Sequence, residues 1–546
     1  MNFPARSSSR VPNRQPRDLK QRLLELFTGL LPFIFLALLF ILSHFLVDVA
    51  VVVILLYIVA WLVRLFGYNH RLLASFYYLK LSSCIDWQAK LEDLKADHPN
   101  LVTAKGFWQT RAERWYNEML YSGIAKKSRL NPDEIYHAVI VAVYNESEDI
   151  IKSTIKAISK SKYDTKRIML LIAYEERGGP KVEAAVNRLV SKYSSKFMLA
   201  KAVKHPDEVP GEAKAKAGNI TCAAKYLSNY CKKHSIPSEQ VLVTTLDADN
   251  RPHPQYLSAL AWTYSVTNNR VQRSYQPIPL FMNNIWDAPA IVRVIATDSS
   301  FWFMIGAMQP HRLRLFSAYA QSLETLQTVD YWNVEVVVED GHQYWRSYFT
   351  FNGDHFALPI WAPIYQDAVL SKSYLKTILA QFRQLLRWAW GTADTPWMIR
   401  QAWRDKEISW PNKIIHILRQ IDDYIAWSTA PIVLAIGGWL PLILSSHAHP
   451  SALITSLPYI TSALQLLALI GLITPVTASM LSLPPRPSRY GKSKNILMVL
   501  QWALEPLALI GFISFASLNA HLRLIFNKPL ETFNATTKTR RGQPVT

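Results

Sequence analysis

The aspartates Asp247 and Asp249 are the residues whose type and spacing most directly suggest chemistry. They follow the apolar stretch Gln240 to Leu246, which predicts a buried strand. Side chains two residues apart in an extended chain point the same way. Two such carboxylates suit a hard divalent cation that keeps its other positions for water and substrate phosphates. The pair therefore predicts a Mg²⁺ or Mn²⁺ diphosphate site, although a solvated acidic turn is the more common meaning of such a pair standing alone.

Two other apolar runs also end in polar residues. The run AVIVAV is followed by Asn145 and Glu146, and the run RIMLLIA is followed by Glu175 and Glu176. The carboxyl ends of parallel strands are where α/β folds bind nucleotides. These runs therefore predict an α/β domain with a nucleotide site at one edge of its sheet.

A lysine and two further acids could complete such a site. Lys216 stands beside Gly218-Asn219 at an expected helix start, where a lysine and free backbone N–H groups can neutralise phosphate. Further along, the run VVVED predicts a strand that ends in Glu339 and Asp340. A carboxylate can act as a general base. Asp340 is the candidate, and Glu339 either orients it or faces water.

Long apolar stretches flank this region. Leu23 to Phe45 and Val47 to Phe66 are each long enough to cross a bilayer, which takes about 20 residues of helix. They predict a transmembrane hairpin, because a cleavable signal peptide is shorter and is not followed at once by a second span. Three more stretches near the C-terminus predict further spans: Tyr424 to Ser446, Leu457 to Leu483 and Ile496 to about Leu518.

The chain therefore divides into six expected parts. These are a basic cytoplasmic tail (1–22), the hairpin (23–66), a cytoplasmic α/β domain without a comparable span (67–395), an interfacial helix region (396–423), C-terminal transmembrane helices (424–523) and a basic tail (524–546). The apolar spacing from Pro411 to Ile425 fits a helix lying at the membrane surface. An ordinary amphipathic helix facing a protein core would show the same pattern.

Basic residues set the expected orientation. Six of them precede the first span: Arg6, Arg10, Arg14, Arg17, Lys20 and Arg22. The positive-inside rule places them in the cytoplasm, as in a multi-pass protein of the plasma membrane. Five spans would then leave the basic C-terminal tail outside, unless the last segment, which is broken at Glu505-Pro506, is re-entrant.

Composition excludes several classes of protein. The 546 residues are 50% hydrophobic and only 18% charged, which excludes disorder as the main state. Three cysteines cannot make a disulfide-built scaffold. The net charge of +20 lies largely next to the apolar stretches, where it meets anionic lipid headgroups. No nucleic-acid motif accompanies it, so nucleic acid is not an expected partner.

The order of the motifs resembles a known family. The motifs are Asn145-Glu146, Lys216-Ala-Gly-Asn219, Asp247-Ala-Asp249, Gln276 with Phe281-x-Asn283, Glu339-Asp340 and Gln384-x-x-Arg387-Trp388. In this order, between membrane spans, they resemble the membrane-embedded family-2 glycosyltransferases, which include cellulose synthase, hyaluronan synthase and related β-polysaccharide synthases. The resemblance covers about residues 135–395.

The resemblance implies a GT-A-type domain with a Rossmann-like, mostly parallel sheet, and it implies a role for each motif. Asp249 would coordinate the metal, Asp247 would lie against metal and diphosphate, and Asp340 would be the general base with Glu339 beside it. Donor-binding residues would be Asn145, Glu146, Glu175, Glu176, Lys216, Asp247, Gln384, Arg387 and Trp388. Acceptor-binding residues would be Gln276, Phe281, Asn283 and Trp388.

The sequence departs from the family at two positions. The second strand usually ends in Asp, and here the equivalent is Glu175 or Glu176. The usual Thr before Glu-Asp is Val338. Outside the motifs, Asp298 could help to hold an acceptor, but an N-cap aspartate is the expected role.

The expected activity is that of a metal-dependent, inverting family-2 hexosyltransferase. One base and one displacement at the anomeric carbon turn an α-linked donor, expected to be a UDP-sugar, into a β-linked product on a growing polysaccharide. Two alternatives remain: transfer of one sugar to a membrane lipid, and a non-catalytic membrane scaffold or channel subunit.

Overall fold

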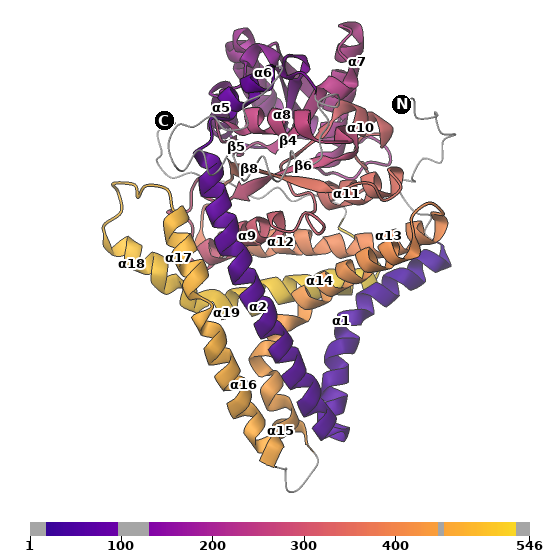
Figure 1. Ribbon diagram of the computed structural model, residues 1–546, viewed down its shortest axis with the longest axis vertical. Helices are drawn as coiled ribbons and strands as arrows, with labels where there is room; N and C mark the ends of the chain where they lie inside the picture. Colours follow the sequence, from indigo (N-terminus) through magenta and orange to yellow (C-terminus); the bar gives the residue numbers. More distant parts are fainter. Residues whose placement is uncertain (1–17, 97–129, 446–451, 531–546) are drawn as a thin grey trace.

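The computed structural model describes residues 18–96, 130–445 and 452–530. Most of the expected N-terminal basic tail and most of the C-terminal one lie outside these residues. The described chain forms an α/β domain above a group of long apolar helices (Figure 1). This arrangement confirms the expected α/β domain with a mostly parallel sheet between N- and C-terminal apolar helices.

One eight-stranded sheet, ordered β3-β2-β1-β4-β7-β6-β8-β5, forms the centre of the domain. Its first half is parallel: β3 (Leu199–His205), β2 (Ile168–Glu175), β1 (Tyr136–Val143) and β4 (Val241–Asp247). In the second half, β7 (Tyr319–Ser322) runs antiparallel to β4 and β6 (Ser274–Leu280), whereas β8 (Ala357–Tyr365) is parallel to β6 and β5 (Arg251–Pro252) is antiparallel to β8. All eight residues of β2 are buried, as expected for a strand covered on both faces.

Helices cover both faces of the sheet. They are α3 (Trp87–Asp93), α5 (Glu148–Ser159), α6 (Pro180–Tyr193), α7 (Lys216–Lys233), α8 (Tyr256–Val266), α9 (Ala290–Ala307), α10 (Leu323–Thr328), α11 (Glu339–Thr350), α12 (Tyr374–Ala389) and α13 (Asp394–Arg404). The sequence of α5 shows why such helices form. Its isoleucines Ile151, Ile155 and Ile158 recur at helical spacing and are fully buried, so one apolar face packs on the sheet.

The start of α11 corrects an expectation. Residues 336–338 form no strand, and Glu339 and Asp340 open α11 instead. Acidic side chains are favoured in the first turn of a helix because its N-terminal N–H groups are unpaired and partially positive. The chain is also not extended through Asp249, because β4 ends at Asp247 and a turn follows.

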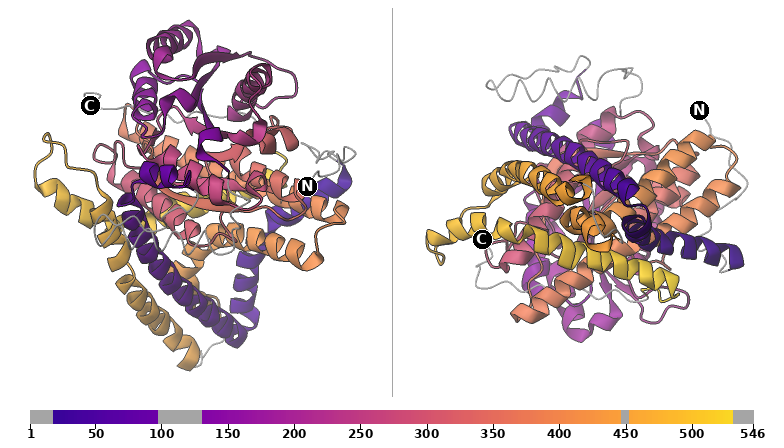
Figure 2. Two further views of the ribbon diagram at one scale, coloured as in Figure 1. Left: turned by 45° about the horizontal axis from the view of Figure 1, so that its top comes forward. Right: turned by 90° about the horizontal axis from the view of Figure 1, so that it is seen from below.

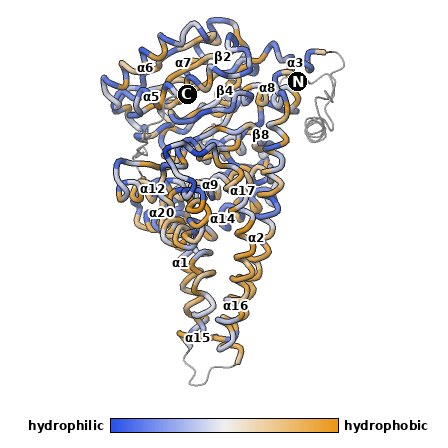
Figure 3. Tube along the Cα trace, turned by 90° about the vertical axis from the view of Figure 1, so that its left-hand side faces the viewer, coloured by the Kyte–Doolittle hydropathy of each residue, from blue (hydrophilic) through white to orange (hydrophobic). Residues whose placement is uncertain are grey.

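Long helices extend away from the domain on one side. They are α1 (Leu19–Phe45), α2 (Val47–Ser83), α14 (Trp410–Ile436) with α15 (Leu440–Leu444), and α16 (Ala452–Ile470) with α17 (Ile473–Ser482). Figure 3 shows that they are predominantly hydrophobic along this extension. The first two form the expected hairpin, although α2 continues as one helix to Ser83, well past residue 66. Similarly, α14 joins the expected interfacial region and the next span into one helix.

Six helices in the described part of the chain are long and apolar enough to cross a membrane. One of them, α9, falls inside residues 67–395, where no comparable span was expected. It is 61% buried within its most apolar window and packs on α2 and β6, so its hydrophobicity serves the protein core. Asp298 lies within α9, whose N-cap is Pro289; the expected N-cap role of Asp298 is therefore wrong.

The last apolar segment lies across the other long helices. It comprises α18 (Ser493–Leu500), α19 (Glu505–Ala508), a π-helical turn (Leu509–Ser514) and α20 (Phe515–Ile525). Figure 2, viewed from below, shows it crossing beneath the domain. Its end is held by α1, since Arg22 Nη1 donates to the carbonyl of Leu524 at 2.7 Å. The segment is nevertheless among the helices long and apolar enough to span a membrane.

Gly178 shows how tightly the edge of the sheet is packed. A Cβ at this position would lie 2.0 Å from the carbonyl oxygen of Tyr144, a backbone atom that cannot move away cheaply. We expect Gly178→Ala to cost about 1–3 kcal/mol of stability through overpacking and to lower the apparent Tm by about 2–5 °C. Thermal unfolding followed by tryptophan fluorescence measures this loss. Gly491→Ala is the matched control, because its nearest neighbour is the Ser493 hydroxyl at 3.7 Å; equal Tm values for both variants would contradict the expectation.

Candidate active site

A single cavity of about 1090 Å³ joins the sheet edge to the long helices. Its domain end lies at the carboxyl ends of β1, β2 and β4, which is the edge where open α/β sheets bind ligands. Asp247, Asp249 and Asp340 all line it. Its other end lies between α2, α14 and α16. The three aspartates singled out in the sequence therefore face one common space.

Lys216 is the cation at the centre of this cavity. Its Nζ lies 2.9 Å from Asp247 Oδ1 and 3.7 Å from Glu339 Oε1, and it donates to the carbonyl of Ser317 at 2.9 Å. Burial alone would lower the pKa of Lys216, but the charges of Asp247 and Glu339 outweigh it and raise the pKa. Lys216 is therefore a stable positive charge. It is the first residue of α7, and the unpaired N–H groups of the first turn of α7 add partial positive charge beside it.

Asp340 has the protonation behaviour of a general base. Burial, followed by the negative charge of Glu339, raises the pKa of Asp340 to about 7. Burial is also the main reason why the pKa of Glu339 is raised, although Lys216 opposes that shift. A base works best when its pKa lies near the operating pH, and Asp340 meets that condition.

Arg387 faces the same acids from α12. Burial lowers the pKa of its guanidinium, while the charges of Asp247, Glu339 and Asp340 act in the opposite direction. Its motif partners Gln384 and Trp388 also line the cavity. The Gln384-x-x-Arg387-Trp388 spacing thus places all three side chains along one helix wall.

The turn after β4 fixes Asp249. Its Oδ2 accepts a hydrogen bond from the backbone N–H of Asp367 at 2.8 Å, and its carbonyl accepts one from Asn283 Nδ2 at 3.0 Å. Asn283 Nδ2 also donates to the carbonyl of Tyr365. The structure therefore places Asn283 behind the turn, where it ties the turn to β8, and not on the cavity wall.

The two aspartates of this turn fit a metal that arrives with its ligand. Asp247 and Asp249 offer only oxygen donors to the cavity, which suits Mg²⁺ or Mn²⁺. Among the residues that the structure describes, no group of three or more His, Cys, Asp or Glu could hold a metal. An ion here would have to complete its shell with diphosphate oxygens and water, as Mg²⁺ commonly does.

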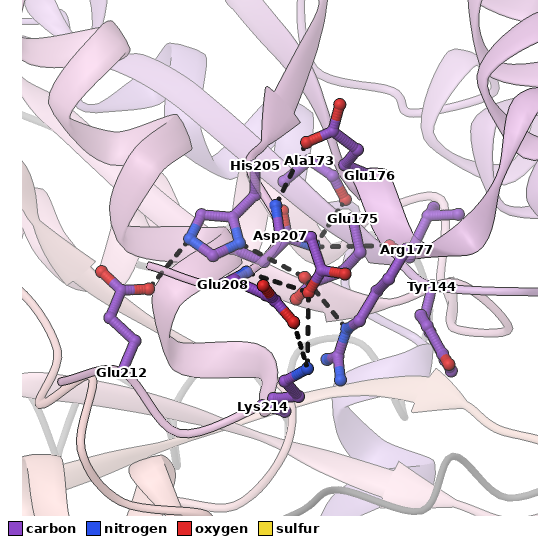
Figure 4. A network of polar contacts seen from close by, with 12 residues as sticks. Tyr144, Ala173, Glu175, Glu176, Arg177, His205, Asp207, Glu208, Glu212 and Lys214 are labelled. Carbon is purple, nitrogen blue, oxygen red and sulfur yellow. Dashed lines mark hydrogen bonds and ion pairs between the residues drawn. The ribbon is translucent and has the colours of Figure 1, made fainter. Parts of the chain in front are cut away.

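The domain end of the cavity includes Glu175, whose side chain is 6% exposed (Figure 4). Its Oε2 lies 3.2 Å from His205 Nδ1 and 3.3 Å from Arg177 Nε. The Arg177 guanidinium lies over the ring of Tyr144, 4.6 Å from its centroid. His205 Nε2 lies 2.9 Å from Glu212 Oε2. A carboxylate, a guanidinium and an aromatic ring thus meet at this end.

The structure distinguishes between the two glutamates at the end of β2. Glu175 lines the cavity, whereas Glu176 is exposed, pairs with Lys204 at 3.1 Å and accepts the N–H of Asp207. The two expected residues in the loop after β1 also differ from each other in position. Glu146 lines the cavity and accepts the N–H of Tyr144 at 2.8 Å, while Asn145 is exposed and is not among the lining residues.

The residues expected at the acceptor are separated in the same way. Phe281 and Trp388 line the cavity with ring centroids 6.1 Å apart. Gln276 is buried in β6; its Nε2 donates to the carbonyls of Pro277 and Ala318, and its Oε1 accepts the N–H of Phe316. Gln276 therefore supports the loop that contains Phe316 and does not contact the cavity.

Sequence reasoning missed Arg177, His205, Glu212 and Arg314. Arg177 directly follows the flagged glutamates and could have been found from that position. His205 and Glu212 have no such signal, because β3 and the loop after it bring them to Glu175 only in the folded chain. Arg314 lies in a loop without a motif and joins the cavity through contacts with α11.

Comparison with known proteins gives distant similarities only. No family model and no curated protein sequence matches the chain. The mannosyltransferase PcManGT from Pyrobaculum calidifontis, solved with GDP-Man and Mn²⁺, matches 81% of this chain and 99% of its own at 16% identity and a TM-score of 0.42. Residues 1–349 of S. aureus TarS with UDP-GlcNAc match 64% of this chain and 93% of their own at 12% identity and a TM-score of 0.33. TM-scores this low do not establish a shared fold, so the geometry of the site carries the functional conclusion.

His205 provides a test of the Glu175 network. Burial would lower its pKa, but Glu175 and Glu212 outweigh burial and raise it above the ordinary 6.5. Its contribution to stability is therefore complete below pH 6.5 and is lost as pH rises through the raised pKa. We expect the Tm of the wild type to fall between pH 6 and pH 9 by an increment that His205→Gln lacks. Parallel Tm-against-pH curves for the two proteins would show that the network has no such charge coupling.

Proposed function

We propose that the protein is an inverting glycosyltransferase with a GT-A-type domain, which moves a sugar from a nucleotide-sugar to an acceptor hydroxyl at the membrane. One observation carries the proposal. Three aspartates and two cations, the buried Lys216 and the half-buried Arg387, converge on one cavity at the carboxyl edge of a parallel sheet, and that cavity continues between apolar helices.

The cations fit the leaving group of this reaction. Breaking a sugar–diphosphate bond leaves negative charge on the diphosphate, and positive groups fixed where that charge develops stabilise the transition state. Lys216 and Arg387 lie on α7 and α12, on either side of Asp247. The nucleotide would then extend along the strand ends toward Glu175, Arg177 and Tyr144. UDP is the nucleotide that the family resemblance implies.

Asp247 and Asp249 would hold a Mg²⁺ or Mn²⁺ ion together with the diphosphate. Such an ion supplies charge neutralisation to the departing phosphate. The hydrogen bond from Asp367 to Asp249 orients one carboxylate, and the turn keeps both acids on the same cavity wall.

Asp340 is the proposed base. Its carboxylate would take the proton from the acceptor hydroxyl as that oxygen attacks the anomeric carbon. A single displacement by a hydroxyl on the face opposite the diphosphate inverts the configuration, so an α-linked donor gives a β-linked product. Glu339 contacts Lys216 and acts on Asp340 through its charge, which is a positioning role.

The acceptor would enter from the membrane end of the cavity. A growing polysaccharide is the acceptor that the resemblance implies, and Phe281 and Trp388 offer aromatic faces for sugar rings. A lipid is the second candidate, favoured by the apolar residues that α2, α14 and α16 contribute to the same cavity. We place the domain in the cytoplasm on the evidence of the arginine-rich N-terminal segment.

The base assignment is tested by Asp340→Asn. We expect kcat for sugar transfer to fall by about 100-fold or more while donor affinity is retained, because the amide cannot accept the hydroxyl proton but keeps the shape of the site. Transfer of radiolabelled sugar and donor binding by isothermal titration measure the two quantities. The matched control, Asp164→Asn, alters an exposed capping aspartate that asparagine replaces well.

The same assignment gives a pH profile. Because Asp340 must be ionised, kcat of the wild type should rise about tenfold per pH unit below pH 7 and level off above it. Wild-type turnover in Asp340→Asn, or a flat profile between pH 5.5 and pH 8, would overturn the assignment.

Metal dependence is tested by a nucleotide-sugar screen in the presence of EDTA, Mg²⁺ or Mn²⁺. We expect EDTA to abolish release of the nucleoside diphosphate, either ion to restore it, and Asp249→Ala to lose it under all conditions, since one of only two carboxylate ligands is gone. Turnover that resists EDTA in the wild type would remove the metal from the proposal. Absence of turnover with any nucleotide-sugar would favour the non-catalytic scaffold.

A further inference from the structure

A second cationic position lies on the cavity wall, away from the proposed diphosphate site. Arg314 belongs to the loop between α9 and β7 and lines the cavity. Its guanidinium lies between two rings of α11, with its central carbon 4.4 Å from the ring centroids of Tyr344 and Trp345. Aromatic faces attract a guanidinium without using up its N–H groups as hydrogen-bond donors.

Arg314 differs from its cationic neighbours in its partners. Arg312 Nη2 pairs with Asp423 at 2.6 Å, and Arg64 Nη2 pairs with Asp422 at 3.3 Å, so these acids are neutralised. Arg314 has only weak neutral contacts, with the carbonyl of Leu313 at 3.4 Å and with His416 Nδ1 at 3.5 Å. In the described part of the chain, no carboxylate lies within ion-pair distance of it.

Arg314 is half-buried in the cavity wall. Burial lowers the pKa of its guanidinium, whereas the charges of Tyr344 and Asp423 act in the opposite direction. Removing a cation from water is costly unless it is paired and hydrogen-bonded, and here the rings and the nearby acid supply only part of that stabilisation. The geometry therefore fits an anion that reaches the guanidinium from the cavity.

The position of Arg314 relative to the proposed base restricts what that anion can be. Asp340 and Arg314 both line the cavity, and Trp345, whose ring lies beside Arg314, follows Asp340 by five residues in α11. A molecule with an anionic group on Arg314 and a hydroxyl near Asp340 would span this part of the cavity.

The long helices contribute many apolar residues to the cavity wall, among them Ile58 and Leu62 of α2, Leu434 of α14, and Leu464 and Leu469 of α16. The same wall also carries polar groups such as Ser462 and Gln465 of α16. Of these helices, α2 and α16 pack on each other and extend away from the domain (Figures 1 and 3). Hydrocarbon suits such walls, whereas sugar hydroxyls would lose hydrogen bonds against them.

We propose that Arg314 binds the phosphate of an anionic membrane lipid, whose headgroup also carries the acceptor hydroxyl and whose chains lie between α2, α14 and α16. The identification of this lipid as the acceptor rests on the proposed function, but the binding site does not. The occupant is thus amphiphilic: a phosphate and a hydroxyl at the domain end, and hydrocarbon at the membrane end.

The test measures lipid binding without any donor. The full-length protein in detergent is titrated with dioleoylphosphatidylglycerol and examined by native mass spectrometry. We expect wild type to retain one lipid and Arg314→Gln to bind it about tenfold or more weakly, since a charge-assisted hydrogen bond is lost. Arg314→Lys, which keeps the charge, should bind with intermediate affinity. Arg523→Gln is the matched control, because Arg523 bonds to Asn519 on α20 and is not among the lining residues.

Two soluble probes separate the possible sources of recognition. Glycerol 1-phosphate carries the headgroup alone; we expect it to bind at least about tenfold more weakly than the lipid, because the chain contacts are missing, and equal affinity would overturn the lipid assignment. A cello-oligosaccharide that binds in an Arg314-dependent way and displaces the lipid would overturn it in favour of a glycan. Equal lipid retention by wild type and Arg314→Gln would overturn the phosphate site.

The outcome does not depend on turnover. Asp164→Asn should bind the lipid like wild type, since this exposed capping residue is not among the lining residues. Lipid binding without donor turnover would therefore refute the proposed function while leaving the site standing. Donor turnover without Arg314-dependent lipid binding would refute only the site.

Discussion

The interaction between Lys216 and the acids around it is the constraint on which the cavity depends. Asp247 and Asp340 line one cavity with Glu339 beside them, where like charges repel and burial of Glu339 disfavours its ionised form. Lys216, at 2.9 Å from Asp247 and 3.7 Å from Glu339, offsets that repulsion. At Asp340, burial and the charge of Glu339 outweigh the effect of Lys216, so the pKa of Asp340 is raised to about 7.

This balance explains why the site is assembled from separate elements. Lys216 opens α7, Asp247 ends β4, and Glu339 opens α11. Strand ends and helix starts expose polar groups without breaking the hydrogen bonds of the element behind them. The sheet therefore keeps its central strands buried while its carboxyl edge carries the charges.

The apolar helices form the other half of the same cavity. Helices α1, α2 and α14 to α17 extend from the domain. The last apolar segment crosses beneath the domain and is held to α1 by Arg22 (Figure 2). Because α9 and α19 pack on each other, domain and membrane helices share walls. A substrate that is polar at one end and apolar at the other can thus occupy a single continuous space.

Several features followed from the sequence alone. The long apolar stretches, the strands before Asn145, Glu175 and Asp247, and the motif acids depend on local composition and spacing, which persist in the fold. The strand predicted over residues 336–338 was wrong. Three valines favour a strand, but the N-terminal dipole of α11 stabilises Glu339 and Asp340 in a helix.

Other features were decided only by tertiary structure. The choice between Glu175 and Glu176, the partnership of Glu175 with His205 and the stacking of Arg314 on α11 join residues far apart in the chain. So does the crossing of the last apolar segment beneath the domain. Sequence spacing specifies which residues share one element, but contacts between elements depend on how their faces pack, and pKa values depend on the burial that packing creates.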